Sequence, residues 1–425
     1  MSNNNSKVRY GIDEKPPIKE LIPLSFQHVM AMFGSTVLVP LLVGLSVNCA
    51  LFTAGIGTLI FLLITKFKVP IFLGSSFAFI PALIAASQLG IEYMAGGVVF
   101  SGLLYCIVSL IISKTGTKWL NRAFSPVVIG SVIICIGLCL APTAVSMSTM
   151  VNGEYSLSAL TIAIVTLFAT IFANNLLKGF ASSIPVMIGL VFGYIFTLVM
   201  GTIFPSFAFI DFSSIGSAKW FAFPSFIAPK YNIGIVLAFL IISFSTMIEH
   251  IGDIYTASKI VGKELYKEPG LNRTLLGDGL GTLFAGFFGG PNNTSYGENL
   301  ATLSISGVHS VYVIFWAAVT SVFLSLFPKF GALISTIPSP CLGGVSMLLF
   351  GSIASSGLRN VVEAGVNYSD KRNLAIASVI MSAGIGGLGL QIALGKSTMF
   401  SIQGVALATV LGLILNFILP LDKNK

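Results

Sequence analysis

The sequence predicts an all-α polytopic membrane protein whose fourteen transmembrane segments form two inverted repeats of seven. Composition is the first observation, because 55% of the 425 residues are hydrophobic and 9% are charged, whereas soluble domains carry roughly 25% charged residues. The second is a succession of apolar runs long enough to cross a bilayer. The third is a repeat between the two halves of the chain. A soluble protein is therefore excluded.

Apolar runs of spanning length account for most of the predicted crossings. They lie at 22–45, 50–66, 96–113, 126–147, 157–177, 184–204, 233–257, 310–328, 373–391 and 402–420. Four further crossings are interrupted by Gly, Pro and Ser, at 69–92, 274–290, 297–309 and 338–358. Because the total is even, both termini are expected on the same side of the membrane.

The positive charges predict which side that is. With the N-terminus in the cytoplasm, all 23 Lys and Arg except Lys219, Lys230, Lys329 and Lys396 lie on the cytoplasmic side, as the positive-inside rule requires. We therefore expect a multi-pass protein of the cytoplasmic membrane with a cytoplasmic tail at 1–20. The tail has no apolar core, so no cleaved signal peptide is expected. Basic residues scattered among loops do not indicate nucleic-acid binding.

An internal repeat supports the division of the chain into two related halves. Ser125-Pro126 followed by Gly130 recurs as Ser339-Pro340 followed by Gly344, at an offset of 339 − 125 = 214 residues. The same offset relates Glu249 to Ser35 in the first span. Because seven is odd, the two halves would be inverted in the membrane, as in many secondary transporters.

The third span of each half is interrupted, at Val69–Ile80 and at Gly290–Leu300. Paired interruptions at corresponding positions point to a binding site, and polar backbone at membrane depth must be buried in protein or line a cavity. We expect each segment to run extended and then turn into a half-helix, with Ser75, Ser76 and Ser295–Gly297 near the helix starts. Free N–H groups at two helix N-termini would then face one cavity.

Four carboxylates fall within apolar spans: Glu249, Asp253, Asp278 and Glu298. Ionisable residues at this depth are candidates for function. Glu249 and Asp253 are spaced i, i+4 and share a helix face. Since burial disfavours a charged carboxyl group, Glu249, Asp253 and Glu298 are candidates for carrying a proton. Asp278 is the candidate for holding the interrupted backbone in place.

These groups suggest a class of ligand. Two helix N-termini, two carboxylates and an aromatic ring suit a flat, neutral heterocycle with both C=O and N–H groups. Phe77 either stacks on that ring or belongs to the core, and His28 either contacts the ligand or bonds between helices. The glutamates would repel an anion. No HExxH or P-loop motif occurs and no CxxC pair, so no metal, cofactor or enzyme activity is expected.

Several motifs in order resemble the nucleobase–ascorbate transporter family, most closely its bacterial uracil permeases. They are Gln27-His28 with Met32-Phe33-Gly34, Leu73–Ile80, Glu249-His250-Ile251-Gly252 and Asn293–Asn299. The similarity extends over nearly the whole chain. It implies a core domain of 21–120 and 231–330 and a gate domain of 121–230 and 331–425, with an elevator-like movement of the core and a homodimer through the gate.

The resemblance also assigns candidate residues. It implies that Glu249 and Glu298 bind the base through their side chains and that Phe77 and Gly297 do so through their backbone, with Ser76 adjacent. Ser35 and Tyr296 are further candidate contacts. The candidate supporting residues are Gln27, His28, Asp278, Asn299 and Phe350, the last standing where the family has a tyrosine near the gate.

The implied function is proton-coupled uptake of uracil, and two departures leave alternatives open. Asp253 stands where uracil permeases can carry His, as purine transporters tend to, whereas Glu298 stands where purine members commonly have Gln. The family signature after Asn299 is also altered at Ala301, Ser306 and Gly307. The alternatives are a carrier of xanthine, uric acid or another purine, and an anion transporter of the same general fold.

Overall fold

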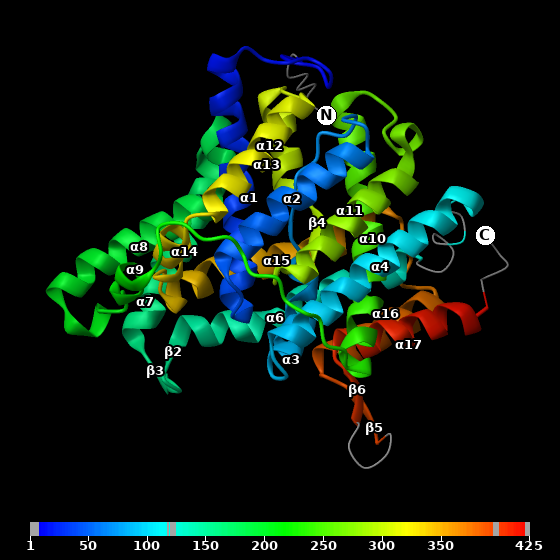
Figure 1. Ribbon diagram of the computed structural model, residues 1–425. Helices are drawn as coiled ribbons and strands as arrows, with labels where there is room; N and C mark the ends of the chain where they lie inside the picture. Colours follow the sequence, from blue (N-terminus) through cyan, green and yellow to red (C-terminus); the bar gives the residue numbers. More distant parts are fainter. Residues whose placement is uncertain (1–7, 117–118, 120–124, 394–398, 421–425) are drawn as a thin grey trace.

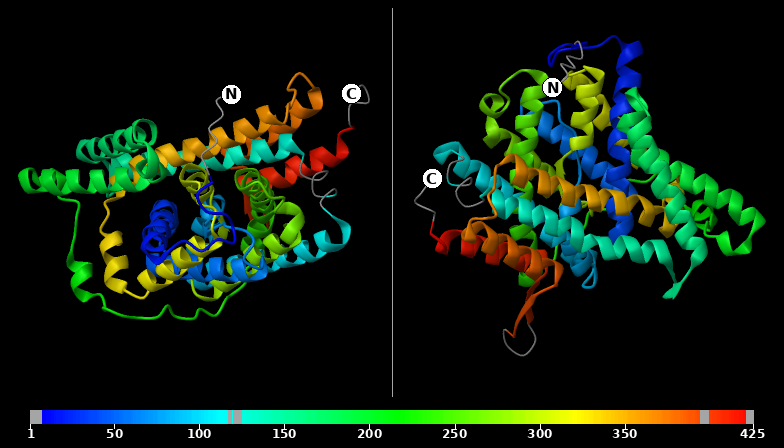
Figure 2. Two further views of the ribbon diagram at one scale, coloured as in Figure 1. Left: turned by 90° about the horizontal axis from the view of Figure 1, so that it is seen from above. Right: turned by 180° about the vertical axis from the view of Figure 1, so that it is seen from behind.

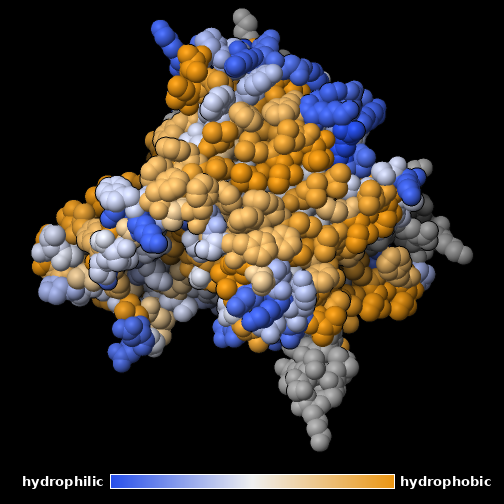
Figure 3. Space-filling model, in the orientation of Figure 1, coloured by the Kyte–Doolittle hydropathy of each residue, from blue (hydrophilic) through white to orange (hydrophobic). Residues whose placement is uncertain are grey.

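The computed structural model describes residues 8–116, 119, 125–393 and 399–420, which form an almost entirely helical molecule (Figure 1). Within these residues, eight helices are long and apolar enough to cross a membrane, and a bent helix pair is a ninth candidate. Figure 3 shows apolar residues over a broad band of the surface, as expected for a face in contact with lipid. The prediction of a helical polytopic membrane protein is confirmed.

Some predicted features fall outside the described residues. They are the first part of the N-terminal tail (1–7), Lys396 and the C-terminal residues 421–425.

The helices follow one another in this order. The first part of the chain contains α1 (Ile18–Val43), α2 (Val47–Ile64), α3 (Ile80–Ser87), α4 (Ile91–Thr115), α6 (Pro126–Thr149), α7 (Leu157–Leu176), α8 (Pro185–Ile203) and α9 (Ser213–Ser217). The second part contains α10 (Ile233–Val261), α11 (Leu271–Phe287), α12 (Gly297–Ser306), α13 (Val311–Ser325), α14 (Pro328–Ser335), α15 (Ser339–Glu363), α16 (Lys371–Ile385) and α17 (Val405–Ile418).

Short strands pair in antiparallel ribbons. They are β1 (Leu73–Ser75) with β4 (Asn293–Ser295), β2 (Met150–Val151) with β3 (Glu154–Tyr155), and β5 (Gly389–Ala393) with β6 (Met399–Gln403). The β1–β4 ribbon joins segments from the two halves of the sequence, whereas the other two ribbons are local hairpins.

One group of helices is built around the β1–β4 ribbon: α1, α2, α10 and α11 contact the ribbon, and α4 and α13 pack against these helices. Glycines let their backbones approach closely. A Cβ atom added at Gly102 on α4 would lie 2.5 Å from the backbone nitrogen of Leu283 on α11. One added at Gly281 on α11 would lie 3.0 Å from the Cα atom of Gly57 on α2. Helix α11 therefore packs against α2 and α4 with no room for larger side chains at these crossings.

A second group contains α6, α7, α8, α15, α16 and α17. Helices α6 and α15, which begin at the two repeated Ser-Pro pairs, run side by side (Figure 2). A Cβ atom at Gly137 would lie 2.5 Å from the carbonyl oxygen of Phe350, and one at Gly357 would lie 2.7 Å from that of Gly130. Because rising numbers on α6 meet falling numbers on α15, the two helices are antiparallel.

The N-terminal segment before α1 is held against the loop between α12 and α13. The backbone N–H of Arg9 donates to the carbonyl of Gly307 at 2.8 Å, and the N–H of His309 donates to the carbonyl of Tyr10 at 2.8 Å. The side chain of Ile12 is buried. The described part of the predicted tail is thus packed on the protein.

In three predicted spans, another helix or a strand occupies part of the predicted run. The run 310–328 ends as α13 at Ser325, and the chain then bends by 85° into α14, because Pro328 cannot continue a helix that would need its N–H group. The run 373–391 ends as α16 at Ile385 and continues into β5, since the glycines from Gly384 to Gly389 weaken a helix. The run 402–420 is shorter, with α17 beginning at Val405. These boundaries were wrong because apolar composition alone does not report helix-breaking residues.

Candidate functional site

The β1–β4 ribbon brings the two interrupted segments together. Leu73 pairs with Ser295, Gly74 with Thr294 and Ser75 with Asn293, and all six residues are buried. The ribbon is extended at both ends, because Ser76 N–H donates to the Asn292 carbonyl at 2.8 Å and Tyr296 N–H donates to the Phe72 carbonyl at 3.1 Å. Buried backbone groups that no helix satisfies are thereby paired across the two halves.

A helix begins immediately after each strand of this ribbon. A 3₁₀ turn begins at Phe77 and leads into α3, and α12 begins at Gly297. These starts lie beside the serines at which the sequence predicts them. The first N–H groups of a helix have no partner within the helix, so both starts offer donors to a bound molecule. A Cβ atom added at Gly297 would meet no atom within 4 Å, so its backbone borders open space.

Glu298 lies in the first turn of α12, beside that open space. The hydroxyl of Ser35 on α1 donates to its Oε1 atom at 2.6 Å, across 263 residues of sequence. The side chain is only partly buried, so its other oxygen is available to an incoming donor. Ser35 therefore holds the carboxylate in place and does not itself need to face the ligand.

Glu249 and Asp253 lie one turn apart on α10, which contacts α12 and β4. Glu249 is exposed although it is in the middle of a long apolar helix, and it is close enough to Glu298 for the two charges to interact. A Cβ atom at Gly252, between them on α10, would meet nothing within 4 Å. Asp253 is partly buried and accepts a hydrogen bond from the Ser295 hydroxyl at 2.5 Å. The three acids Glu249, Asp253 and Glu298 thus form one cluster beside open space.

Asp278 belongs to a different environment. It is fully buried on α11, where its Oδ2 atom lies 3.0 Å from Nδ1 of the equally buried His250 on α10. Nearby, the Tyr105 hydroxyl on α4 donates to Thr246 Oγ1 at 2.7 Å. His250 follows Glu249 in sequence and is turned about 100° from it around α10, so that it is buried whereas Glu249 is exposed. Asp278 therefore links helices and is separated from open space by packed side chains, which fits the supporting role suggested by its sequence context.

His28 and Asn299 form a second buried link. The Asn299 side-chain amide lies 3.0 Å from His28 Nδ1 and donates to the His28 carbonyl at 3.2 Å. The pair joins α1 to α12 one residue after Glu298. Gln27 is partly exposed beside it, and Phe350 is buried in an apolar cluster on α15. Phe77, at one of the two helix starts, packs against the same apolar cluster as Phe350.

Tyr296 points into the protein. Its ring packs over Gly74, where a Cβ atom would lie 2.5 Å from the ring carbons, and its hydroxyl donates to the Ser75 carbonyl at 2.9 Å. It also accepts from the Thr36 hydroxyl at 3.1 Å. The side chain is therefore committed to the ribbon, and only the backbone of this residue is near the open space at Gly297.

We expect Tyr296→Phe to lower the free energy of unfolding by about 1–2 kcal/mol, because a buried carbonyl and a buried hydroxyl each lose a partner. The measurement is thermal unfolding of the purified protein in detergent. Tyr312→Phe is the matched control, because the Tyr312 hydroxyl makes no hydrogen bond within the described residues. Equal unfolding temperatures for the Tyr296 variant and the parent protein would contradict the assignment.

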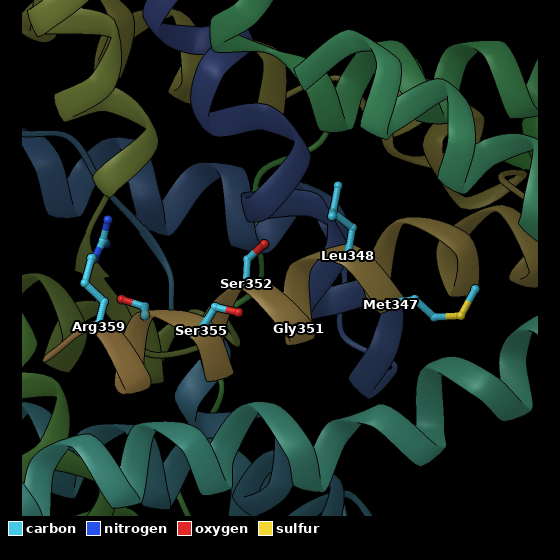
Figure 4. Close-up of a pocket in the computed structure, with 7 residues that line it drawn as sticks. Met347, Leu348, Gly351, Ser352, Ser355 and Arg359 are labelled. Carbon is cyan, nitrogen blue, oxygen red and sulfur yellow. The ribbon is translucent and has the colours of Figure 1, made fainter. Parts of the chain in front are cut away.

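A cavity of about 570 Å³ lies along one side of α15. Its lining residues recur at helical spacing and are Met347, Leu348, Gly351, Ser352, Ser355, Ser356 and Arg359. Figure 4 shows Leu348, Ser352 and Arg359 projecting from the same side of the helix. This polar stripe was not predicted, although the spacing of its serines and of Arg359 was the available signal. The partners of Ser295 and Thr36 were not predicted either, because they are distant in sequence.

Comparison with known proteins gives the family. A model of the Permease family matches residues 19–418. The chain belongs to the Permease family. This permease is 46% identical to the uracil permease of Bacillus caldolyticus over 417 residues, which are 96% of this chain and 94% of the relative. It is 39% identical to the uracil permease of Escherichia coli strain K12, covering 97% of this chain and 94% of the relative.

These matches confirm the resemblance to nucleobase–ascorbate transporters and their uracil permeases, and they identify the permease as a transporter. Solved structures show the same fold at low identity. The transmembrane domain of a cyanobacterial bicarbonate transporter, BicA, matches with a TM-score of 0.61 at 16% identity, covering 96% of this chain and all of that one (100%). Murine solute carrier 26 family member A9, an anion transporter in the inward-facing state, matches with a TM-score of 0.66 at 12% identity, covering 96% and 69%.

The chemistry available at the permease's acidic cluster is hydrogen bonding. Glu249 and Glu298 can accept N–H groups, and the helix starts at Phe77 and Gly297 can donate to carbonyl oxygens. Within the described residues, no group of three His, Cys, Asp or Glu is arranged to hold a metal ion. The arrangement suits a neutral molecule that carries donors and acceptors on one flat edge.

Proposed function

We propose that this permease carries uracil into the cell together with a proton. The observation that supports this most directly is Glu298, which Ser35 holds at the start of α12 beside open space and close to Glu249. Relatives that cover nearly the whole chain are named uracil permease. Uracil is flat and neutral, and its ring presents both N–H and C=O groups, which complement carboxylates and helix N–H donors.

In the proposed complex, Glu249 and Glu298 accept the N–H groups of the base. The backbone N–H groups at Phe77 and Gly297 donate to its carbonyl oxygens, with Ser76 beside them and the Phe77 ring against the base. The partial positive charge at two helix starts favours electron-rich carbonyl oxygens there. Two carboxylates in one site disfavour an anion, which separates a nucleobase from the cargo of an anion transporter.

The proton is proposed to reside within the acidic cluster. Glu249, Asp253 and Glu298 are close enough to repel one another when charged, so taking up one proton stabilises the cluster. Such groups titrate together, and we assign the proton to the cluster with Asp253 as the residue that exchanges it. The base can then bind to the charged carboxylates of Glu249 and Glu298 while the proton neutralises the neighbouring Asp253. Both are carried in one step.

The proposed architecture has fourteen spans in two inverted halves, with both termini in the cytoplasm. The order of elements supports this, because α1, α2, β1 with α3, and α4 are followed by three long helices, and a similar order restarts at α10. The helix group around the β1–β4 ribbon would be the moving core, of 21–120 and 231–330. The other group would be the gate, of 121–230 and 331–425, and would form the contact in a homodimer, with the bilayer around both.

Uptake of radiolabelled uracil tests this function, in cells that lack their own permease. We expect accumulation that collapses when a protonophore is added and that excess unlabelled xanthine does not compete away. Competition by xanthine or uric acid would favour the purine alternative, for which Asp253 is the specific sequence feature. Absence of uracil uptake despite confirmed membrane insertion would contradict the proposal.

A further inference from the structure

Within the described residues, Ser295 makes the one side-chain hydrogen bond that joins an acid on α10 to the β1–β4 ribbon. Its hydroxyl donates to Asp253 Oδ2 at 2.5 Å, and its side chain is 3% exposed. Ser295 is the last residue of β4, two positions before the start of α12. This hydrogen bond therefore gives Asp253 a direct polar link to the backbone that leads into Gly297 and Glu298.

The surroundings of Asp253 leave this hydroxyl as its main polar partner. Glu249 lies one turn earlier on α10, Glu298 lies on α12 and Asp278 lies on α11, and all three carboxylates act on Asp253. The buried ring of His250, also on α10, lies 3.0 Å from Asp278. Within the described residues, no lysine or arginine forms an ion pair with Asp253. The Ser295 hydroxyl donates to this carboxylate, and such a bond favours the charged form of Asp253 over the protonated form.

We propose that Ser295 is the positioning residue that sets when Asp253 exchanges its proton and that transmits this change to the substrate site. The inference rests on the proposed proton-coupled function. A charged Asp253 holds the end of β4 through the Ser295 hydroxyl, and a protonated one holds it more weakly, because a neutral carboxyl is a poorer acceptor. Protonation thus loosens the link between α10 and the segment that leads into Glu298, and proton release restores it.

The test compares the pH profiles of uracil uptake into proteoliposomes that contain the full-length protein. In the parent protein, uptake should fall as the outer pH rises. In Ser295→Ala, the alkaline limb of the profile should move to higher pH by about one unit, because one charge-assisted hydrogen bond is lost. Ser295→Thr keeps the hydroxyl and should keep the parent profile, and Ser295→Cys, a weaker donor, should move it by a smaller amount.

Two further variants separate this role from a merely structural one. Because Asp253→Asn removes the group that exchanges the proton, this background is tested by binding of radiolabelled uracil to the purified protein, where adding Ser295→Ala should leave the pH dependence of binding unchanged. Ser148→Ala is the matched control, because Ser148 is a buried serine on α6 whose hydroxyl donates to the carbonyl of Ala144 in its own helix at 2.7 Å.

The possible results distinguish the two proposals. A uniform loss of uptake at every pH in Ser295→Ala, with no movement of the profile, would overturn the role of Ser295 and leave proton coupling intact. A change in the pH dependence of uracil binding when Ser295→Ala is added to Asp253→Asn would also overturn the role of Ser295. Uptake by the parent protein that ignores both pH and protonophore would overturn proton coupling and this inference together.

Discussion

Glu298→Gln is expected to reduce uracil uptake by about 100-fold or more while the protein still reaches the membrane. Glutamine keeps the size of the side chain but removes the charge that the Ser35 hydroxyl and the base N–H group both complement. Its amide N–H₂ group would also face the donors of the base. Losing a charge-assisted hydrogen bond and creating a donor–donor contact in a partly desolvated site account for an effect of this order. Initial rates of radiolabelled uptake, divided by the amount of protein in the membrane, give the measurement.

Glu92→Gln is the control for this change. Glu92 is likewise a glutamate in the first turn of a helix, α4, but its side chain is 40% exposed and pairs at 3.7 Å with Lys230, whose side chain is 60% exposed. Exposed ion pairs contribute little, so its loss should leave uptake near the parent rate. Normal uptake by inserted Glu298→Gln protein would remove Glu298 from the substrate site.

Gly297→Val is expected to reduce uracil uptake by about 100-fold without lowering thermal stability. Gly297 has ordinary helical backbone angles and no atom lies within 4 Å of an added Cβ, so the fold has room for a side chain there. The base would occupy this same space, where it would contact the backbone N–H group of Gly297. A displacement of about 1 Å at a binding site can reduce turnover by this factor. Uptake and the unfolding temperature in detergent are measured on the same preparation.

The control for Gly297→Val is Gly216→Val. Gly216 lies on α9, and an added Cβ also meets no atom within 4 Å, but the residue is far in sequence from both interrupted segments. This variant should keep both uptake and stability. Full uptake by Gly297→Val would show that the substrate does not occupy the space beside Gly297. A lowered unfolding temperature would show instead that the side chain disturbs α12.

Several parts of the site could be predicted from local sequence alone. The interruptions at Val69–Ile80 and Gly290–Leu300 predict extended backbone followed by a helix, because glycine and proline break helices and serine begins them. The helices do begin at Phe77 and Gly297. The i, i+4 spacing of Glu249 and Asp253 predicts a shared helix face. These predictions depend on neighbours within one or two turns, which the sequence contains directly.

Other parts could not be predicted. Ser35 meets Glu298 across 263 residues, and Ser295 meets Asp253 across 42. Helical periodicity says which residues share a face but not which helix packs against that face. For the same reason, the direction of Tyr296 into the ribbon and the link between His250 and Asp278 were open until the helices were placed.

The sequence by itself determined that the protein is a helical membrane protein of the Permease family, and which acids lie at membrane depth. Those facts follow from composition, from spacing and from motifs that are contiguous in the chain. Only the tertiary structure decided which acids border open space and which are buried between helices. Glu249 and Asp278 are both carboxylates within apolar spans, yet one is exposed and the other fully buried. That difference arises from the packing of α10 against α4, α11 and α12. The properties of a carboxyl group depend on its burial and on the groups that this packing places around it.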